Sequence, residues 1–233
     1  MKILGIAGST RKEDQSGVYK LVEATLKATN MDYELVHLRG KKIGGCIACL
    51  GCVEDNVCVL KDDMAELREK IVEADAYVIG APNYYSTMNA ITHALLERFY
   101  QFRHREGDTL WGKLGVAVGV GGSSGAVCTT EIERFFMYNF IETVAKVDGQ
   151  HAASCFICGY GETCGVGAVR MLLGEGVKIT AENTPSVAKN PALMEEAKNA
   201  GVALAARLMD NHDRRAVTER MQATLMAEFA KTT

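Results

Sequence analysis

Four cysteines crowd one short stretch of the chain with the spacing C-x2-C-x2-C-x5-C: Cys46, Cys49, Cys52 and Cys58. Few ligands need three thiolates so close together. A cubane iron–sulfur cluster does, because a tight loop can reach three of its iron corners and a nearby fourth cysteine closes the site. The spacing therefore predicts that all four thiolates bind one 4Fe–4S cluster.

Two related cysteine patterns fit this run less well. Structural zinc usually takes paired C-x2-C knuckles separated by a longer stretch, and here Cys52 falls inside what would be the turn of the first knuckle. The bacterial ferredoxin run places its last cysteine after three residues and before a proline, whereas Cys58 follows a gap of five and precedes Val59. Zinc or unligated thiols remain the alternative interpretation.

A second cysteine group, Cys155, Cys158 and Cys164, repeats the spacing from Cys49 through Cys58. It holds only three thiols, so another cluster would need Cys128, a residue of a partner or an open iron. We interpret the group as buried or reactive thiols without metal. We therefore predict that changing Cys158 and Cys164 to Ser leaves the iron content unchanged.

The residues 8–18 form a hydroxyl-rich turn between a candidate strand and a candidate helix. Hydroxyls and the amides at the start of a helix can hydrogen-bond an anion, and Arg11 adds positive charge, so the turn suits a phosphate monoester. The turn contains neither the Walker pattern nor G-x-G-x-x-G, which disfavours a Rossmann dinucleotide site. An ordinary polar turn is the alternative.

Two further loops follow later candidate strands. One, residues 80–88, carries Tyr84 and Tyr85, and the other, residues 119–125, is rich in glycine. Aromatic rings and exposed backbone amides can border a flat heterocycle, and glycines let a ligand approach the backbone closely. Surface tyrosines and a simple turn are the alternatives, but three such loops at consecutive strand ends favour one ligand site.

The elements that must position these loops alternate along the chain. The candidate strands are Lys2–Ala7, Tyr33–Leu38, Ala76–Ala81, Leu114–Val120 and Ala152–Ile157. Helical patterns separate them, the clearest running from Val18 to Leu26 with an i, i+3, i+4 apolar stripe. The alternation predicts an α/β fold with a doubly wound, five-stranded parallel sheet in the order 2-1-3-4-5, with ligands beyond the carboxyl ends of the strands.

We expect one domain over residues 1–210, with the cysteine-rich loop at 39–60 after the second strand. Residues 211–233 are expected to form a C-terminal helical tail. Its apolar residues recur every four positions, which suits packing either on its own domain or against another subunit. They are Val217, Met221, Leu225 and Phe229.

The composition limits the classes of function. The chain has 233 residues, 48% hydrophobic residues, 24% charged residues and a formal net charge of −3. This charge gives no support to a nucleic-acid partner, and no apolar run is long enough for a membrane span. Eight cysteines without a secretory leader are typical of metal or redox chemistry in a reducing compartment, so we expect a cytoplasmic protein.

The motifs together resemble the iron–sulfur flavoproteins, a branch of the NAD(P)H-dependent FMN reductase-like group. The resemblance rests on G-S-x-R-K (Gly8 to Lys12), the cysteine run, A-P-x-Y (Ala81 to Tyr84) and G-G-S (Gly121 to Ser123), over roughly residues 1–125. It implies a flavodoxin-like fold with one FMN and one 4Fe–4S cluster per subunit. It also implies a homodimer or homotetramer in which the cluster of one subunit lies near the FMN of its neighbour.

The resemblance also assigns site residues. It implies that the first turn holds the FMN phosphate through Ser9, Arg11, Ser16, Gly17 and Val18. It implies that two loops border the isoalloxazine ring and ribityl chain: Pro82, Asn83, Tyr84, Tyr85 and Ser86 on one side, and Gly121, Gly122 and Ser123 on the other. The chain departs from the family pattern at Thr10, which replaces the usual Pro, and in its second cysteine group.

These assignments indicate electron transfer between the cluster and FMN, from a ferredoxin-like donor to a small acceptor such as a quinone or an oxygen species. No Ser-His-Asp set or carboxylate pair indicates another catalytic centre. One alternative is an NAD(P)H-dependent FMN or quinone reductase whose four-cysteine metal site is structural. Another is a redox sensor that responds to loss of the cluster.

Overall fold

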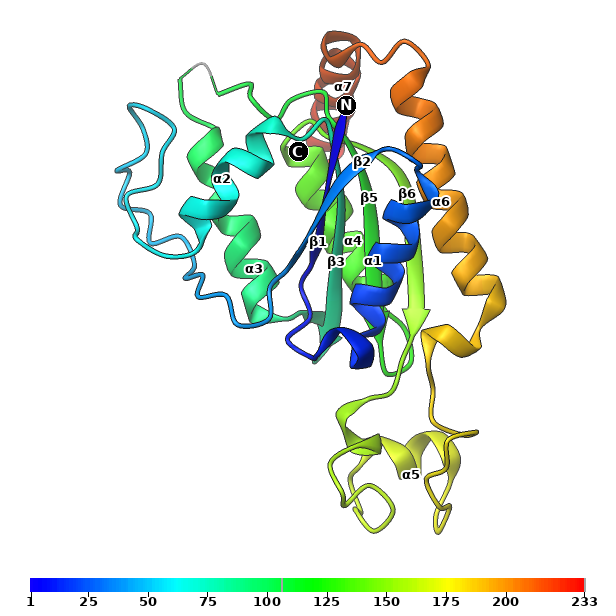
Figure 1. The fold of residues 1–233 in the computed structure, drawn as a ribbon. Helices are drawn as coiled ribbons and strands as arrows, with labels where there is room; N and C mark the ends of the chain where they lie inside the picture. Colours follow the sequence, from blue (N-terminus) through cyan, green and yellow to red (C-terminus); the bar gives the residue numbers. More distant parts are fainter. Residues whose placement is uncertain (106, 233) are drawn as a thin grey trace.

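A twisted sheet stands between two layers of helices in the computed structural model, which describes residues 1–105 and 107–232 (Figure 1). Five strands run parallel, and β4 pairs antiparallel with the end of β3. The strands are β1 (Lys2–Ala7), β2 (Asp32–His37), β3 (Ala76–Tyr84), β4 (Thr87–Met88), β5 (Leu114–Gly121) and β6 (Glu142–Gln150). The inner strands β1, β3 and β5 are buried almost throughout, as expected for a sheet covered on both faces.

Each helical layer closes its own hydrophobic core. Helices α1 (Gly17–Ala28) and α6 (Pro191–Met209) cover one face of the sheet, and α2 (Met64–Glu73), α3 (Ala90–Glu97) and α4 (Ala126–Tyr138) cover the other. Both helices of the first layer begin at a side-chain cap, because Ser16 Oγ accepts the Tyr19 N–H and Asn190 Oδ1 accepts the Leu193 N–H. The caps fix the residues at which these two helices begin.

The predicted strand count needs a correction. The sheet has six strands, in the order β2-β1-β3-β5-β6 with β4 off this path, instead of five in the order 2-1-3-4-5. The added strand exists because the chain reverses at Tyr85 and Ser86, which pairs Tyr84 with Thr87 and Asn83 with Met88. The α/β class and the parallel pairing of the main strands agree with the prediction.

The last strand was predicted in the wrong place. It runs over Glu142–Gln150, whereas Ala152–Ile157 leaves the sheet and contains a 3-10 turn at Ser154–Phe156. As an edge strand that pairs only with β5, β6 keeps several polar and partly exposed residues and lacks the apolar run of a central strand. The apolar residues after it instead build a small separate core around Phe156 and Val169.

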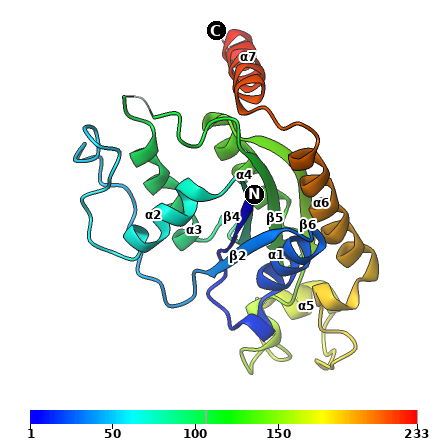
Figure 2. The same ribbon diagram turned by 45° about the horizontal axis from the view of Figure 1, so that its top comes forward.

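That small core belongs to a lobe, residues 151–190, which includes α5 (Ala168–Leu173) and lies beyond the carboxyl ends of the strands (Figure 1). At the other end of the molecule, α7 (Arg214–Thr232) projects away from the sheet, as Figure 2 shows. Val217 and Leu225 of α7 are buried, and the Phe229 and Tyr138 rings lie 6.3 Å apart, so this helix contacts its own domain. Within the described residues, no helix has the length and apolar character required to span a membrane.

Candidate functional site

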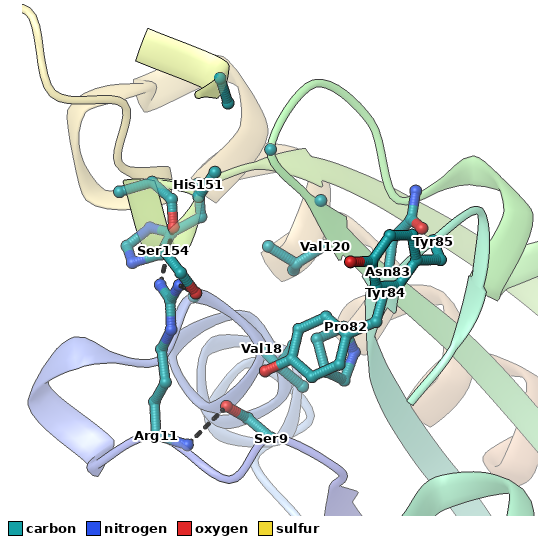
Figure 3. Close-up of a pocket in the computed structure, with 16 residues that line it drawn as sticks. Ser9, Arg11, Val18, Pro82, Asn83, Tyr84, Tyr85, Val120, His151 and Ser154 are labelled. Atoms are coloured by element: carbon teal, nitrogen blue, oxygen red, sulfur yellow. Dashed lines mark hydrogen bonds between the residues drawn. The ribbon is translucent and has the colours of Figure 1, made fainter. Parts of the chain in front are cut away.

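A cavity of about 560 Å³ lies at the carboxyl ends of the strands, between the first turn, the β3–β4 hairpin, the loop after β5 and the lobe (Figure 3). This is the position at which doubly wound sheets bind their ligands. Ten of the thirteen predicted binding residues line it: Ser9, Arg11, Gly17, Val18, Pro82, Asn83, Tyr84, Tyr85, Gly121 and Gly122. The three predicted loops therefore meet around one space.

The first turn supplies the polar wall of the cavity. Ser9 is buried, and its Oγ accepts the Arg11 N–H at 3.2 Å. The Arg11 guanidinium donates to the Ala152 carbonyl oxygen at 2.7 Å and to Ser154 Oγ at 3.2 Å, so it joins the turn to the lobe. The first N–H groups of α1 open onto the same wall at Gly17 and Val18, where a helix has no internal partners for them. An anion at this wall would meet both a cation and backbone donors.

His151 closes the wall between the first turn and the lobe. Its Nδ1 accepts the Val187 N–H at 3.3 Å, and the opposite nitrogen lies 3.1 Å from the Gln15 carbonyl oxygen, so the neutral ring carries its proton on Nε2. Burial lowers the pKa of His151, and the nearby Arg11 lowers it further, which keeps the ring neutral. A Cβ at Gly17 would stand 2.8 Å from the ring, so only glycine lets it pack there.

The β3–β4 hairpin supplies the aromatic wall. Tyr85 and Ser86 both have positive φ, 53° and 61°, which is the backbone of a two-residue type I′ hairpin turn. Tyr and Ser rarely occupy such positions, so the turn stores backbone strain beside the cavity. Tyr84 borders the cavity, and the Tyr85 side chain is fully exposed at its mouth. The hairpin thus offers exposed aromatic surface at the cavity.

Hydrogen bonds tie the loops to one another. Asn83 Nδ2 donates to the Ser124 carbonyl oxygen at 3.0 Å and so connects the hairpin to the glycine loop. Asn89 Nδ2 donates to the Gly8 carbonyl oxygen at 2.7 Å and connects the hairpin to the first turn. Gln150 Nε2 donates to the Gly122 carbonyl oxygen at 3.0 Å. These bonds hold the cavity walls in place before any ligand binds.

Three predicted binding residues lie outside the cavity lining. Ser16 is buried as the cap of α1, while Ser86 and Ser123 are exposed beside the cavity. The sequence reasoning missed six lining residues: Val120, His151, Ala152, Ala153, Ser154 and Ala168. Five of these follow β6, and the misplaced last strand concealed them. Among these five, only the imidazole of His151 and the hydroxyl of Ser154 could have indicated a binding role from the sequence.

The cysteine run forms an irregular loop on the flank of α2 and α3, away from the cavity end of the sheet (Figure 1). Cys46 and Cys49 are exposed, Cys58 is partly buried and Cys52 is buried. Ala48 and Leu50, on either side of Cys49, have φ of 52° and 58°. Left-handed backbone at such residues is costly and is typical of loops that clamp a ligand.

Polar residues at the end of α3 and in the following turn hold this loop. Glu97 Oε2 accepts the Cys46 N–H at 3.1 Å, and Gln101 Oε1 accepts the Cys58 N–H at 3.0 Å. The fully buried Arg98 donates to Asp62 at 2.6 Å and to the Gly44 carbonyl oxygen at 3.1 Å. These anchors were not identified from the sequence. The sequence does contain an indication of them, because these three polar residues interrupt the apolar and aromatic residues of the segment 94–102.

The thiols of the loop influence one another. Burial raises the pKa of Cys52, and the neighbouring thiols of Cys58, Cys46 and Cys49 raise it further, because several thiolates so close repel. Cys52 Sγ also lies 3.3 Å from His104 Nε2. Within the described residues, no three Cys, His, Asp or Glu side chains are arranged as the site of a metal ion. The structure therefore places the four predicted cysteines on one anchored loop without a preassembled ion site.

Comparison with known proteins places this architecture in a family. The sequence pattern of the NADPH-dependent FMN reductase family matches residues 1–153. An iron–sulfur flavoprotein of Methanocaldococcus jannaschii is 34% identical over 154 residues, which cover 64% of this chain and 78% of that protein. One of Archaeoglobus fulgidus is 36% identical over 121 residues, which cover 51% and 53% of the two chains. The similarity to the latter thus spans about half of its length.

Solved structures share the fold at low sequence identity. A flavone reductase superposes with a TM-score of 0.58 at 15% identity, covering 92% of this chain and 65% of that one. An NADH:FMN oxidoreductase superposes with a TM-score of 0.53 at 15% identity, covering 92% and 93%. These superpositions support the fold alone. The family pattern matches the residues that form most of the cavity, and the similarity to the M. jannaschii protein covers most of that protein's length. The chain therefore belongs to the NADPH-dependent FMN reductase family, among its iron–sulfur flavoproteins.

Proposed function

We propose that the cavity binds FMN and that the protein is a flavin-dependent oxidoreductase. The observation that carries this proposal is the convergence of three consecutive strand-end loops on a space of about 560 Å³, a typical volume for a cofactor site. Ser9, Arg11 and the first amides of α1 suit the phosphate, and Tyr84 and Tyr85 suit the flat ring. Ser16, Ser86 and Ser123 lie outside the cavity lining and stay proposed as further FMN-binding residues.

The cysteine loop fits a 4Fe–4S cluster by the chemistry of its donors. Four thiols share one loop, the loop has strained backbone on either side of Cys49, and thiolate sulfur is the donor that an iron–sulfur cluster takes. The N–H groups of Cys46 and Cys58 donate to the side-chain oxygens of Glu97 and Gln101, which anchors the loop at both ends of the cysteine run. Cys46, Cys49, Cys52 and Cys58 are the proposed ligands.

Together the two cofactors would pass electrons between a donor and a small acceptor. A flavin exchanges electrons in pairs or singly and a cluster one at a time, so the pair can connect the two kinds of carrier. The cavity lies at the carboxyl ends of the strands, whereas the cysteine loop lies on the flank of α2 and α3 (Figure 1). We therefore propose a homodimer or homotetramer in which the cluster of one subunit serves the FMN of another. A ferredoxin-like donor and a quinone or oxygen species as acceptor complete the proposal.

Anaerobic stopped-flow mixing with reduced ferredoxin tests this route. We expect rapid reduction of the cluster, followed by its re-oxidation when a quinone or an oxygen species is added. A cluster that stays reduced after the acceptor is added would refute the route, and the double variant Cys49→Ser, Cys52→Ser provides the control without a cluster.

The family pattern favours one second candidate, direct reduction of FMN by NADPH with a structural role for the cysteine loop. The fully exposed Tyr85 at the cavity mouth is consistent with it, because a nicotinamide ring could stack there. Rapid bleaching of the flavin by NADPH in the cluster-free double variant would favour this reductase over the ferredoxin route.

A further inference from the structure

The lobe that forms one wall of the cavity carries three cysteines, Cys155, Cys158 and Cys164, to which the proposed function gives no role. All three carry free thiols, and within the described residues they do not form a metal-ion site. Thiols can exchange electrons by forming and breaking disulfide bonds, so their place beside a proposed redox cofactor site suggests a redox role.

Cys155 adjoins the cavity wall through its sequence neighbour Ser154 and through a hydrogen bond to its own sulfur. Its neighbour Ser154 lines the cavity and accepts a hydrogen bond from Arg11. Its own sulfur accepts the N–H of Ala168 at 3.3 Å, and Ala168 also lines the cavity. The Cys155 sulfur therefore contacts a residue of the cavity wall directly. The surrounding small core, which includes Phe156 and Val169, partly shields it from solvent.

Cys155 and Cys164 face the same backbone position. A Cβ at Gly167 would stand 3.3 Å from Cys164 Sγ and 3.8 Å from Cys155 Sγ, so both sulfurs lie within reach of the same point beside this glycine. Both residues are partly buried. Cys158 differs, because its sulfur is exposed and contacts backbone atoms: the carbonyl oxygen of Cys155 at 3.5 Å and the Tyr160 N–H at 3.4 Å.

We propose that Cys155 and Cys164 form a dithiol–disulfide pair that exchanges electrons with the flavin in the adjacent cavity, which rests on the proposed function. On oxidation, the two thiols lose two electrons and two protons to a small-molecule disulfide, which is cleaved to two thiols, and a Cys155–Cys164 bond forms. On reduction, the S–S bond breaks as it takes two electrons and two protons from the reduced flavin, which returns to its oxidised form. The net activity is flavin-linked reduction of small disulfides.

The pair can form with little rearrangement of the cavity. Cys164 lies in the loop before α5, among exposed residues such as Val166, so closure needs a movement of this loop and none of the sheet. Gly167 has no side chain to obstruct the approach, since any Cβ there would already contact Cys164. The small core on the other side of Cys155 can remain packed.

Differential alkylation of the flavin-loaded protein tests the proposal. The protein is treated anaerobically with oxidised glutathione, its thiols are trapped, and peptides are mapped by mass spectrometry. We expect a Cys155–Cys164 disulfide that reopens when the flavin is photoreduced and that persists when flavin-free protein is illuminated in the same way. Cys158→Ser should behave like the wild type, whereas Cys155→Ser and Cys164→Ser should each lose the cross-link.

The possible failures are distinguishable. A purified protein without flavin absorption bands would refute the proposed function. In flavin-loaded protein, two thiols that never cross-link, or a disulfide that survives flavin photoreduction, would overturn the dithiol proposal and leave FMN binding intact. Peptide mapping keeps any disulfide among the cysteines of the cluster loop separate from this readout.

Discussion

At the scale of single residues, Arg11 combines two roles, because it binds the lobe and lines the cavity. Its guanidinium holds the lobe through Ala152 and Ser154, and it carries the positive charge nearest the proposed phosphate site. Its sequence neighbour Lys12 is exposed and faces a different hollow, so the two residues separate a general charge effect from a contact in the cavity.

We predict that Arg11→Ala weakens FMN binding by about 10- to 100-fold, the usual cost of losing hydrogen bonds to a charged group. Quenching of flavin fluorescence during titration of the apoprotein measures the dissociation constant. Lys12→Ala is the matched control and should change it little. Equal losses in both variants would show that Arg11 acts only through the overall charge.

Most of the individual cavity residues could be predicted because they lie at the carboxyl ends of strands or just beyond them, as Pro82 near the end of β3 and Ser9 after β1 do. His151 and Ser154 could not, since their place depends on where β6 ends and on contacts with Gln15 and Arg11 far away in the sequence. Local patterns report strand ends, but they do not report which distant segment returns to cover them.

At the scale of elements, the two cysteine segments are held in place by different parts of the structure. The loop at residues 39–60 is anchored by Glu97, Arg98 and Gln101, whereas the lobe at 151–190 holds its cysteines against its own small core. The first segment offers four thiols close enough for the other three to raise the pKa of Cys52, and the second offers three, of which Cys155 and Cys158 have backbone partners. Only the first therefore has the donor set for a 4Fe–4S cluster.

We predict that Cys49→Ser removes most of the iron, and that the double variant Cys158→Ser, Cys164→Ser retains the wild-type content. Iron per chain is measured by a colorimetric assay on protein purified without oxygen. Flavin content serves as the control for folding, since none of the substituted cysteines lines the cavity. Loss of iron in the double variant would mean that the lobe also binds metal.

At the scale of the whole molecule, the parallel sheet and its two helical layers followed from the alternation of apolar strands with amphipathic helices. The strand count and the last strand did not, because β4 depends on a strained turn and β6 is a polar edge strand. The division into residues 1–210 and a tail at 211–233 stays a proposal, although α7 contacts α4 through Phe229 and Tyr138.

A buried lysine at the base of the sheet makes the stability of the whole fold depend on pH. Burial lowers the pKa of Lys113 to about 7, with the nearby Arg214 lowering it and Asp75 opposing the shift. Its ammonium donates to the Ile71 and Val72 carbonyl oxygens. Because the unfolded chain retains the proton up to the ordinary lysine pKa, the unfolded state binds more protons between pH 7 and about 10, and stability rises with pH there.

We predict that the free energy of unfolding of the wild type, relative to Lys113→Met, increases between pH 7 and 9 by up to about 1.4 kcal/mol per pH unit. Urea denaturation of both proteins under anaerobic conditions measures it. Lys146→Met, which removes an exposed lysine, is the matched control variant. A flat difference for Lys113→Met would show that its ammonium stays protonated throughout.

The central claim, one flavin and one iron–sulfur cluster on the same chain, is tested most directly by an anaerobic absorption spectrum of protein purified without oxygen. We predict a broad shoulder near ~400 nm above the flavin bands, and bleaching of both on reduction. Clean flavin bands without the shoulder would contradict the account and would indicate a simple reductase whose cysteine loop holds zinc or free thiols.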